Sequence, residues 1–222
     1  MIKEDNMIVL NLKTYPQSIE KALLFADIAG EVVEETGIRI VLCPPVTHLQ
    51  ATAERFSQTF AQHSDFCQLG ANTGYLPVES LKHIKVKGSL VNHSERRIGM
   101  ENIAKTVDKL HQEGLESLVC AETAEEAEQI ANLNPTYIAI EPPELIGGGI
   151  SVSNAKPELV TNTVAAIKKA NPKITVLCGA GVSNKEDTKK ALKLGAKGVL
   201  LASAFVKAKD PKEFLLGLTS VF

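Results

Sequence analysis

The chain has 222 residues, of which 44% are hydrophobic and 23% charged, a composition typical of a folded globular protein rather than a disordered one. Its 24 Lys and Arg nearly balance 26 Asp and Glu, and the net charge of −2 argues against nucleic acid or an acidic membrane surface as a partner. The longest nearly apolar stretch, residues 198–206, is far shorter than the roughly 20 residues that span a bilayer, so we expect no membrane association and a cytoplasmic location.

Short apolar runs recur along the chain, and they predict eight β-strands. Each run is too short for a helix and is rich in β-branched residues or leucine. Several runs lack the alternation of apolar and polar residues, which is typical of strands buried on both faces of a parallel sheet. The predicted strands are 7–10, 38–42, 59–61, 88–91, 115–120, 137–140, 174–177 and 198–201.

Segments with helical start signals lie between these runs. Ser94-Glu95 and Thr123 each precede such a segment, and residues 183–186 read as a capping box, in which a serine and a glutamate cap each other's backbone N–H groups. Apolar residues of 154–170 recur at helical spacing and predict a face that packs on a sheet. The predicted helices are 19–35, 96–111, 124–131, 154–170 and 185–194.

Strand and helix alternate without a linker or a low-complexity segment, and eight such units fill the 222 residues at about 28 residues each. This pattern predicts an α/β fold, a closed (β/α)8 TIM barrel that forms one domain over residues 1–222. An open doubly wound sheet is the alternative. That fold usually has a glycine-rich turn after its first strand, where this chain has Asn11-Leu12-Lys13-Thr14.

Polar residues that follow the predicted strands are candidates for the chemistry, because barrel enzymes place their catalytic groups at the carboxyl ends of the strands. Lys13 follows the first strand and could neutralise an anionic substrate, although a lysine at a solvated rim would have the same sequence position. The other residues in such positions are Asn11, Asn92, His93, Glu122 and Glu141.

His93 and Glu141 have the most distinctive surroundings of these residues. His93 directly precedes the helix start predicted at Ser94-Glu95, whose partial positive charge would keep the imidazole neutral. Glu141 lies between an apolar strand and Pro142-Pro143, and a carboxylate among apolar groups could act as a base. From the spacing alone, a structural role for His93 and a surface position for Glu141 remain open as alternatives.

Small residues follow the last two predicted strands, in loops where barrel folds often hold a phosphate on backbone N–H groups. They are Gly179-Ala180-Gly181 after the seventh strand and Ala202-Ser203 after the eighth. Together the two loops predict a phosphate site. Either loop alone would be a weak signal, because small residues also allow helices to pack closely. The run Ile146-Gly147-Gly148-Gly149 has the composition of a hinge or of an ordinary flexible turn.

The cysteines and the remaining histidines lack a metal-binding pattern. The four cysteines form no CxxC pair, which predicts free thiols in a reducing compartment rather than a disulfide framework or a zinc site. His48, His63, His83 and His111 have neither the HExxH spacing nor another ligand spacing. We therefore expect no metal site.

Four motifs, read in chain order, resemble the triosephosphate isomerase family. They are Asn11-x-Lys13, the string Asn-His-Ser-Glu-Arg-Arg at 92–97, the segment 137–149 and Cys-Gly-Ala-Gly at 178–181. The resemblance covers the full chain, and the order and separation of the second and third motifs make it highly specific. The short length and the Glu-Pro-Pro-Glu-Leu-Ile sequence are similar to the compact archaeal branch, which implies a homotetramer.

The resemblance implies that the protein interconverts dihydroxyacetone phosphate and glyceraldehyde 3-phosphate through an enediolate, without a cofactor or a metal. In this reading, Glu141 is the base that moves a proton between two carbons, and neutral His93 polarises the carbonyl. Lys13 and Asn11 match the residues that stabilise negative charge on the substrate oxygen.

Other matched positions concern the phosphate and a lid over the site. By the resemblance, backbone N–H groups at Gly147, Gly181, Ala202 and Ser203 hold the phosphate, and Ile146 is the tip of the lid. Bacterial and eukaryotic members have different residues at several of these positions, but the backbone N–H donors survive those changes. The extra glycine at the end of the lid could raise the entropic cost of closing it.

Three further residues match supporting positions: Ser94 and Glu95 beside the catalytic pair, and Thr73, which would reach from one subunit toward the active site of its neighbour. Two other functions stay open as alternatives. Another phosphosugar isomerase or epimerase barrel would share the last two loops but would not need His93 together with Glu141. A non-enzymatic barrel that binds a phosphorylated metabolite could lose the base.

Overall fold

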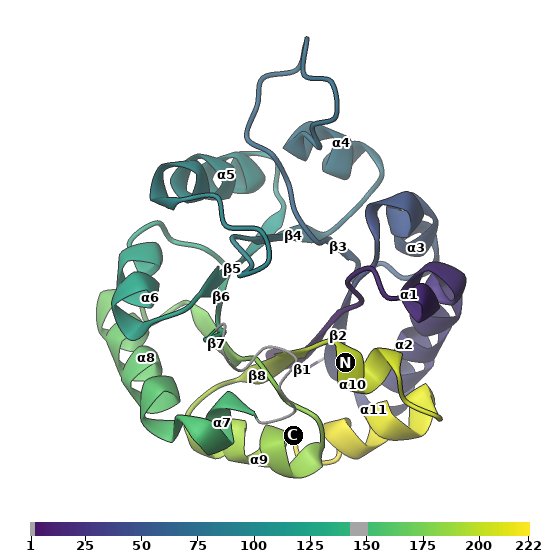
Figure 1. Ribbon diagram of the computed structural model, residues 1–222, viewed down its shortest axis with the longest axis vertical. Helices are drawn as coiled ribbons and strands as arrows, with labels where there is room; N and C mark the ends of the chain where they lie inside the picture. Colours follow the sequence, from purple (N-terminus) through teal and green to yellow (C-terminus); the bar gives the residue numbers. More distant parts are fainter. Residues whose placement is uncertain (1–2, 143–150) are drawn as a thin grey trace.

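Within residues 3–142 and 151–222, the ranges that the computed structural model describes, eight parallel strands form the predicted barrel (Figure 1). Each predicted strand is present, and the bounds differ by one residue at most, except that the first strand is longer. The strands are β1 (Lys3–Asn11), β2 (Ile38–Cys43), β3 (Phe60–Ala61), β4 (Gly88–Val91), β5 (Glu116–Ala121), β6 (Tyr137–Ile140), β7 (Thr175–Cys178) and β8 (Gly198–Leu201).

The strands are hydrogen-bonded in the order β2-β1-β8-β7-β6-β5-β4-β3. The barrel closes between β2 and β3 through a parallel bridge of Leu42 with Thr59, where the N–H of Leu42 donates to the carbonyl of Gln58 at 3.0 Å. Closure brings the carboxyl ends of these strands to one face of the molecule. Residues far apart in the sequence can therefore meet there.

Helices surround the barrel, as Figure 1 shows. None of those in the described residues combines the length and apolar character of a membrane-spanning segment. The sequence patterns do not predict the short helices α3, α4, α10 and α11. The helices are α1 (Pro16–Glu20), α2 (Ala22–Thr36), the 3-10 helix η1 (Val46–His48), α3 (Leu49–Arg55), α4 (Val78–His83), α5 (Met100–Gln112), α6 (Ala124–Ala131), α7 (Val152–Ala155), α8 (Pro157–Ala170), α9 (Lys185–Lys193), α10 (Ser203–Val206) and α11 (Pro211–Thr219).

Two helix starts follow from capping residues. Helix α6 has the predicted bounds, and the Thr123 side chain caps it by accepting the backbone N–H of Glu126. Helix α9 also begins where the sequence predicts, but its N-cap is Asn184, whose side chain accepts the N–H of Asp187. The predicted capping box that begins at Ser183 is therefore wrong by one residue.

Three other predicted helices differ in their bounds. The segment 19–35 is interrupted at Lys21, between α1 and α2. The segment 154–170 is interrupted at Lys156, which has a φ of −139° and precedes a proline, a position that disfavours helical backbone. Helix α5 begins only at Met100, after Gly99 with a φ of 75°, so the predicted helix start at Ser94-Glu95 is wrong.

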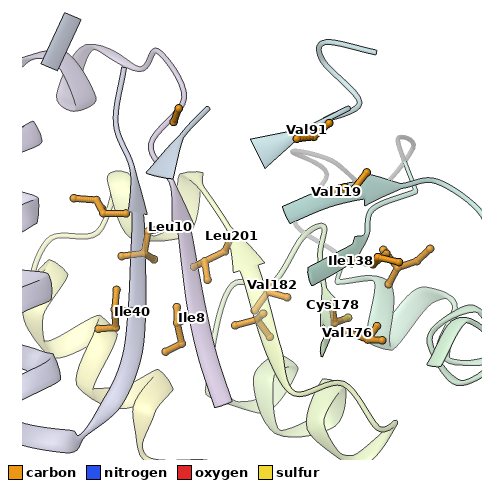
Figure 2. Close-up of a cluster of buried hydrophobic side chains, with 14 of the residues drawn as sticks. Ile8, Leu10, Ile40, Val91, Val119, Ile138, Val176, Cys178, Val182 and Leu201 are labelled. Atoms are coloured by element: carbon orange, nitrogen blue, oxygen red, sulfur yellow. The ribbon is translucent and has the colours of Figure 1, made fainter. Parts of the chain in front are cut away.

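Apolar side chains of the strands form two layers, because successive residues of a strand point to opposite faces of the sheet. This double burial explains the unalternating apolar runs, and each fully buried aliphatic side chain contributes about 1.5–3 kcal/mol. Side chains in the barrel interior include Met7, Val9, Val41, Phe60, Leu90, Leu118 and Leu177. Side chains between the sheet and the helices include Ile8, Leu10, Ile40, Val91, Val119, Ile138 and Leu201 (Figure 2).

A polar network fills the amino-terminal end of the barrel. Arg39 Nη2 in β2 donates to Glu116 Oε2 at 2.9 Å, and the Tyr137 hydroxyl donates to the same carboxylate at 2.7 Å. Burial raises the pKa of Tyr137 to about 12, so the hydroxyl keeps its proton and remains a donor. Side chains thus fill the amino-terminal end of the barrel, which leaves the carboxyl ends of the strands for a catalytic site.

Candidate active site

A cavity at the carboxyl ends of the strands brings together many of the predicted site residues. It is lined by Lys13, His93, Glu141, Gly181, Ala202 and Ser203. Asn11 and Glu95 line an adjoining depression, again with Lys13 and His93. Groups from the first, fourth, sixth, seventh and eighth strand ends therefore meet at one place.

The end of β1 fixes the backbone of Lys13 in an unusual conformation. Lys13 has a φ of 48°, in the left-handed region that is uncommon for residues with side chains. Its N–H donates to the side-chain oxygen of buried Asn11 at 3.0 Å. Gln62 Nε2 donates to the carbonyls of Lys13 and Cys43, at 3.0 and 2.9 Å. The sequence does not identify Gln62, although it directly follows the third strand.

The ammonium group of Lys13 is held at the cavity by a carboxylate. Lys13 Nζ lies 2.7 Å from Glu95 Oε1, and the two side chains are 15% and 55% exposed. Such a partly solvated ion pair contributes little to folding stability, about 0–1 kcal/mol. It does restrict where the cation lies, so a positive charge is kept at the cavity that His93 also lines.

His93 is buried, and its hydrogen bond fixes the arrangement of its ring. The backbone N–H of Glu95 donates to His93 Nδ1 at 3.1 Å. An amide N–H cannot act as an acceptor, so Nδ1 carries no proton in this arrangement and Nε2 carries it in the neutral ring. Because α5 begins at Met100, the donor belongs to a turn and not to the helix that the sequence predicts.

The turn after β4 is held by Asn92. This residue has a φ of 61°, its Oδ1 accepts the N–H of Ile98 at 3.1 Å, and its Nδ2 donates to the carbonyl of Cys120 at 3.1 Å. These bonds fix both ends of the turn. Asn92 thus orients the donor that reaches the imidazole of His93, a role that its position after a strand does not specify.

Glu141 is 3% exposed and has a free carboxylate oxygen. Its Oε2 accepts no hydrogen bond from the residues that the structure describes and lies 3.5 Å from His93 Nε2. Burial raises the pKa of the neighbouring Cys120 thiol well above its usual range, and the charge of Glu141 raises it further. The thiol therefore stays protonated and does not compete with Glu141 as a base.

Gly179, the first residue after β7, makes room for Glu141. A Cβ at this position would lie 2.9 Å from both Cγ and Oε1 of Glu141, and 3.1 Å from the carbonyl of Leu200. Contacts this short force one of the groups to move. The absence of a side chain at Gly179 is thus part of how the carboxylate is placed.

Backbone N–H groups line the other side of the cavity. Gly181 has a φ of 74°, a conformation that favours glycine. Ser203 begins α10, where the first N–H groups have no partner within the helix. Neither N–H donates to another residue of the described ranges. Such groups can bind the oxygens of a phosphate.

Some predicted site residues do not lie in the cavity. Thr73 is exposed in the chain between β3 and α4, which extends away from the barrel (Figure 1). Glu122 pairs with Arg97 at 3.4 Å outside the cavity. Ser94 adjoins His93 but has a buried hydroxyl that lacks a partner among the described residues. The predicted lid residues Ile146 and Gly147 lie outside the described ranges.

Metal ligands are not grouped in this part of the chain: residues 3–142 and 151–222 contain no set of three or more His, Cys, Asp or Glu side chains that could hold a metal ion. The cavity instead combines a carboxylate, an imidazole, an ammonium group and free backbone donors. This arrangement suits proton transfer on a small anionic molecule.

Comparison with known proteins identifies the family. The model of the family described as triosephosphate isomerase matches residues 6–218. The triosephosphate isomerase of Methanothermus fervidus is 47% identical over 211 residues, which cover 94% of this chain and 95% of that one. The protein of the same name from Methanocaldococcus jannaschii is 46% identical over 209 residues, which cover 93% of this chain and 95% of that one. The one from Archaeoglobus fulgidus is 42% identical over 222 residues, which cover 98% of this chain and 100% of that one. The chain therefore belongs to the triosephosphate isomerase family.

Proposed function

We propose that the protein interconverts dihydroxyacetone phosphate and D-glyceraldehyde 3-phosphate, with Glu141 as the base. The observation that carries this proposal is the free Oε2 of Glu141, 3.5 Å from His93 Nε2, in a cavity that also contains Lys13 and unpartnered backbone N–H groups. Family membership supports the same reaction.

Glu141 performs the proton transfer at carbon. Its carboxylate takes a proton from C1 of dihydroxyacetone phosphate, and the C–H electron pair becomes the C1–C2 double bond. The carbonyl electron pair moves onto O2, which gives an enediolate. Glu141 then returns the proton to C2, so that the base is regenerated at the end of each turnover.

His93, Lys13 and Asn11 act on the oxygens. The Nε2–H of neutral His93 polarises the carbonyl and moves a proton between O1 and O2. The ammonium group of Lys13 and the side-chain amide of Asn11 stabilise the negative charge that develops on oxygen. Ser94 and Glu95 support these groups, Glu95 through its bonds to both His93 and Lys13.

The substrate phosphate lies on the backbone N–H groups of Gly181, Ala202 and Ser203 in this proposal. Free backbone donors bind an anion without an added counter-charge, and the start of α10 favours negative charge. The reaction moves protons and electron pairs within one substrate, so neither a metal nor a cofactor is part of the proposal.

A coupled assay tests the function. Purified protein is mixed with glyceraldehyde 3-phosphate, and the dihydroxyacetone phosphate formed is reduced by a second enzyme while NADH absorbance is followed. We expect turnover by the wild-type chain and a kcat about 10³-fold lower for Glu141→Gln. If the wild-type chain is inactive but binds inorganic phosphate, a phosphometabolite-binding role replaces the proposal.

We also propose a cytoplasmic homotetramer in which Thr73 reaches the active site of a neighbouring subunit. Phe66, Leu69 and Tyr75, which flank Thr73, are 44%, 66% and 55% exposed, and apolar side chains so exposed often mark an interface. Light scattering should give a mass near four times the chain mass of 23.9 kDa, and Leu69→Asp should lower it. A wild-type mass of 23.9 kDa at micromolar concentration would contradict the assembly.

A further inference from the structure

Asp187 is a buried carboxylate that the proposed chemistry does not use. It lies in the first turn of α9 and is 5% exposed. A carboxylate removed from water needs hydrogen bonds to offset its lost hydration. The donors that supply these bonds indicate what the residue does.

Two of the donors belong to the turn that follows β7. The backbone N–H and the hydroxyl of Ser183 donate to Asp187 Oδ2, at 3.0 and 2.9 Å. Ser183 follows Gly181 by two residues and lines the same cavity. Asp187 thus fixes the end of the turn that presents Gly181.

Two more donors belong to the start of α7. The Ser151 hydroxyl and Asn154 Nδ2 donate to Asp187 Oδ1, at 3.0 and 2.6 Å. The buried hydroxyl of Ser153 donates to the backbone carbonyl of Asp187 at 3.3 Å. The carboxylate therefore joins the turn after β7 to α7, the first described helix after Glu141.

Helix capping does not account for this arrangement. Asn184 already caps α9 by accepting the N–H of Asp187 at 2.9 Å, and exposed Glu186 supplies negative charge in the same turn. Neither function requires a carboxylate that is buried and turned toward Ser183 and α7. The orientation of the Asp187 carboxylate is instead explained by the two segments that it connects, the turn after β7 and α7.

We propose that Asp187 is a positioning residue for the substrate phosphate. Gly181 has a φ of 74°, and glycine exchanges readily between positive and negative φ, so its N–H faces the cavity only if the turn is held elsewhere. Asp187 holds the turn through Ser183, while its bonds to α7 fix its own orientation. This inference rests on the proposed phosphate site at Gly181 and Ser203.

The variant Asp187→Ala tests the role, with Asp210→Asn as a matched control. Asp210 is an exposed carboxylate that caps α11 and accepts the N–H of Glu213, with no bond to Ser183 or α7. In Asp187→Ala, loss of charge-assisted hydrogen bonds should raise both the KM for glyceraldehyde 3-phosphate and the Ki of inorganic phosphate about tenfold. In Asp210→Asn both constants should stay within about twofold of wild type.

A substrate without phosphate separates positioning from a general loss of activity. The slow isomerisation of D-glyceraldehyde should fall less than about twofold in Asp187→Ala, because no phosphate contact contributes to that reaction. Asn154 is exposed, so Asn154→Ala removes one of the four bonds with little risk to folding, and it should raise the Ki of phosphate about threefold. Lower melting temperatures with an unchanged Ki in both variants would overturn the proposal and leave a structural role.

Amide NMR distinguishes failure of this inference from failure of the phosphate site. In the wild-type protein, inorganic phosphate should shift the resonances of Gly181 and Ser203, and the shift at Gly181 should need more phosphate in Asp187→Ala. No shift in the wild type would overturn the phosphate site and this inference with it. Identical titrations in both proteins would overturn the role of Asp187 alone.

Discussion

Nε2 of His93 lies 3.5 Å from Oε2 of Glu141, and that oxygen accepts no hydrogen bond from any described residue. The other ring nitrogen of His93 already accepts the N–H of Glu95 at 3.1 Å. The imidazole can therefore donate into the cavity while the carboxylate accepts. A substrate in the cavity that contacts both groups would meet a base at carbon and a donor at oxygen together.

Glu141→Gln should lower kcat about 10³-fold, because the amide keeps the shape of the side chain but cannot take a proton. The Ki of inorganic phosphate should stay near the wild-type value, since the backbone donors are unchanged. Glu122→Gln is the control, because Glu122 also follows a strand but pairs with Arg97 outside the cavity. Steady-state kinetics check the result, and a Glu141→Gln variant that retains a tenth of the rate would exclude Glu141 as the base.

Gly179→Ala should lower kcat about 10²-fold with little change in KM. The added Cβ would lie 2.9 Å from Cγ and Oε1 of Glu141, so the carboxylate must move, and displacements near 1 Å cost about this much in rate. Substrate binding depends mainly on other groups.

Gly217→Ala is the matched control for this substitution. Gly217 lies within α11, and a Cβ there would meet nothing within 4 Å. Alanine in a helix interior should raise the free energy of unfolding by about 0.5–1 kcal/mol and leave kcat unchanged. Equal kcat values for the two variants would remove the proposed role of Gly179.

The barrel is predictable from the sequence because its strands are buried on both faces. Runs such as Ile38 to Leu42 carry a signal that does not depend on knowing their neighbours. Helix starts are less certain, since they depend on local backbone geometry. Gly99, with its φ of 75°, delays α5, so the histidine lies beside a turn rather than a helix end. The N–H of Glu95 still reaches the ring of His93, but it belongs to this turn and not to a helix start.

Only part of the candidate site can be predicted from the sequence, for a related reason. Glu141 directly follows β6, and His93 and Lys13 lie two residues after β4 and β1, so the barrel fold predicts that they meet at one face. Gln62 and Asp187 act through contacts with residues distant in sequence, Gln62 with Cys43 and Asp187 with Asn154. No periodicity or motif encodes such contacts, and only the folded chain reveals them.

Lys13→Met should raise KM and lower kcat together. In the proposed reaction the ammonium group would attract the anionic substrate and also stabilise the charge that develops on oxygen, and loss of one such group typically costs about 10²–10³ in kcat. Lys207→Met is the control, since that cation lies over the Tyr15 ring, 4.9 Å from its centroid, and does not line the cavity. A rise in KM with unchanged kcat would limit Lys13 to binding.

In the neutral imidazole ring of His93, the proton should be on Nε2. The backbone N–H of Glu95 donates to Nδ1 at 3.1 Å and cannot accept in return, so a proton on Nδ1 would break this bond inside a buried site. Nitrogen-15 NMR of labelled histidine distinguishes the two tautomers and the charged ring by their nitrogen shifts and two-bond couplings. Glu95→Gln keeps the backbone donor and should preserve the Nε2–H pattern. Glu95→Pro removes that donor and should abolish the preference, whereas a wild-type ring protonated on Nδ1 would contradict its role as the donor to the substrate carbonyl.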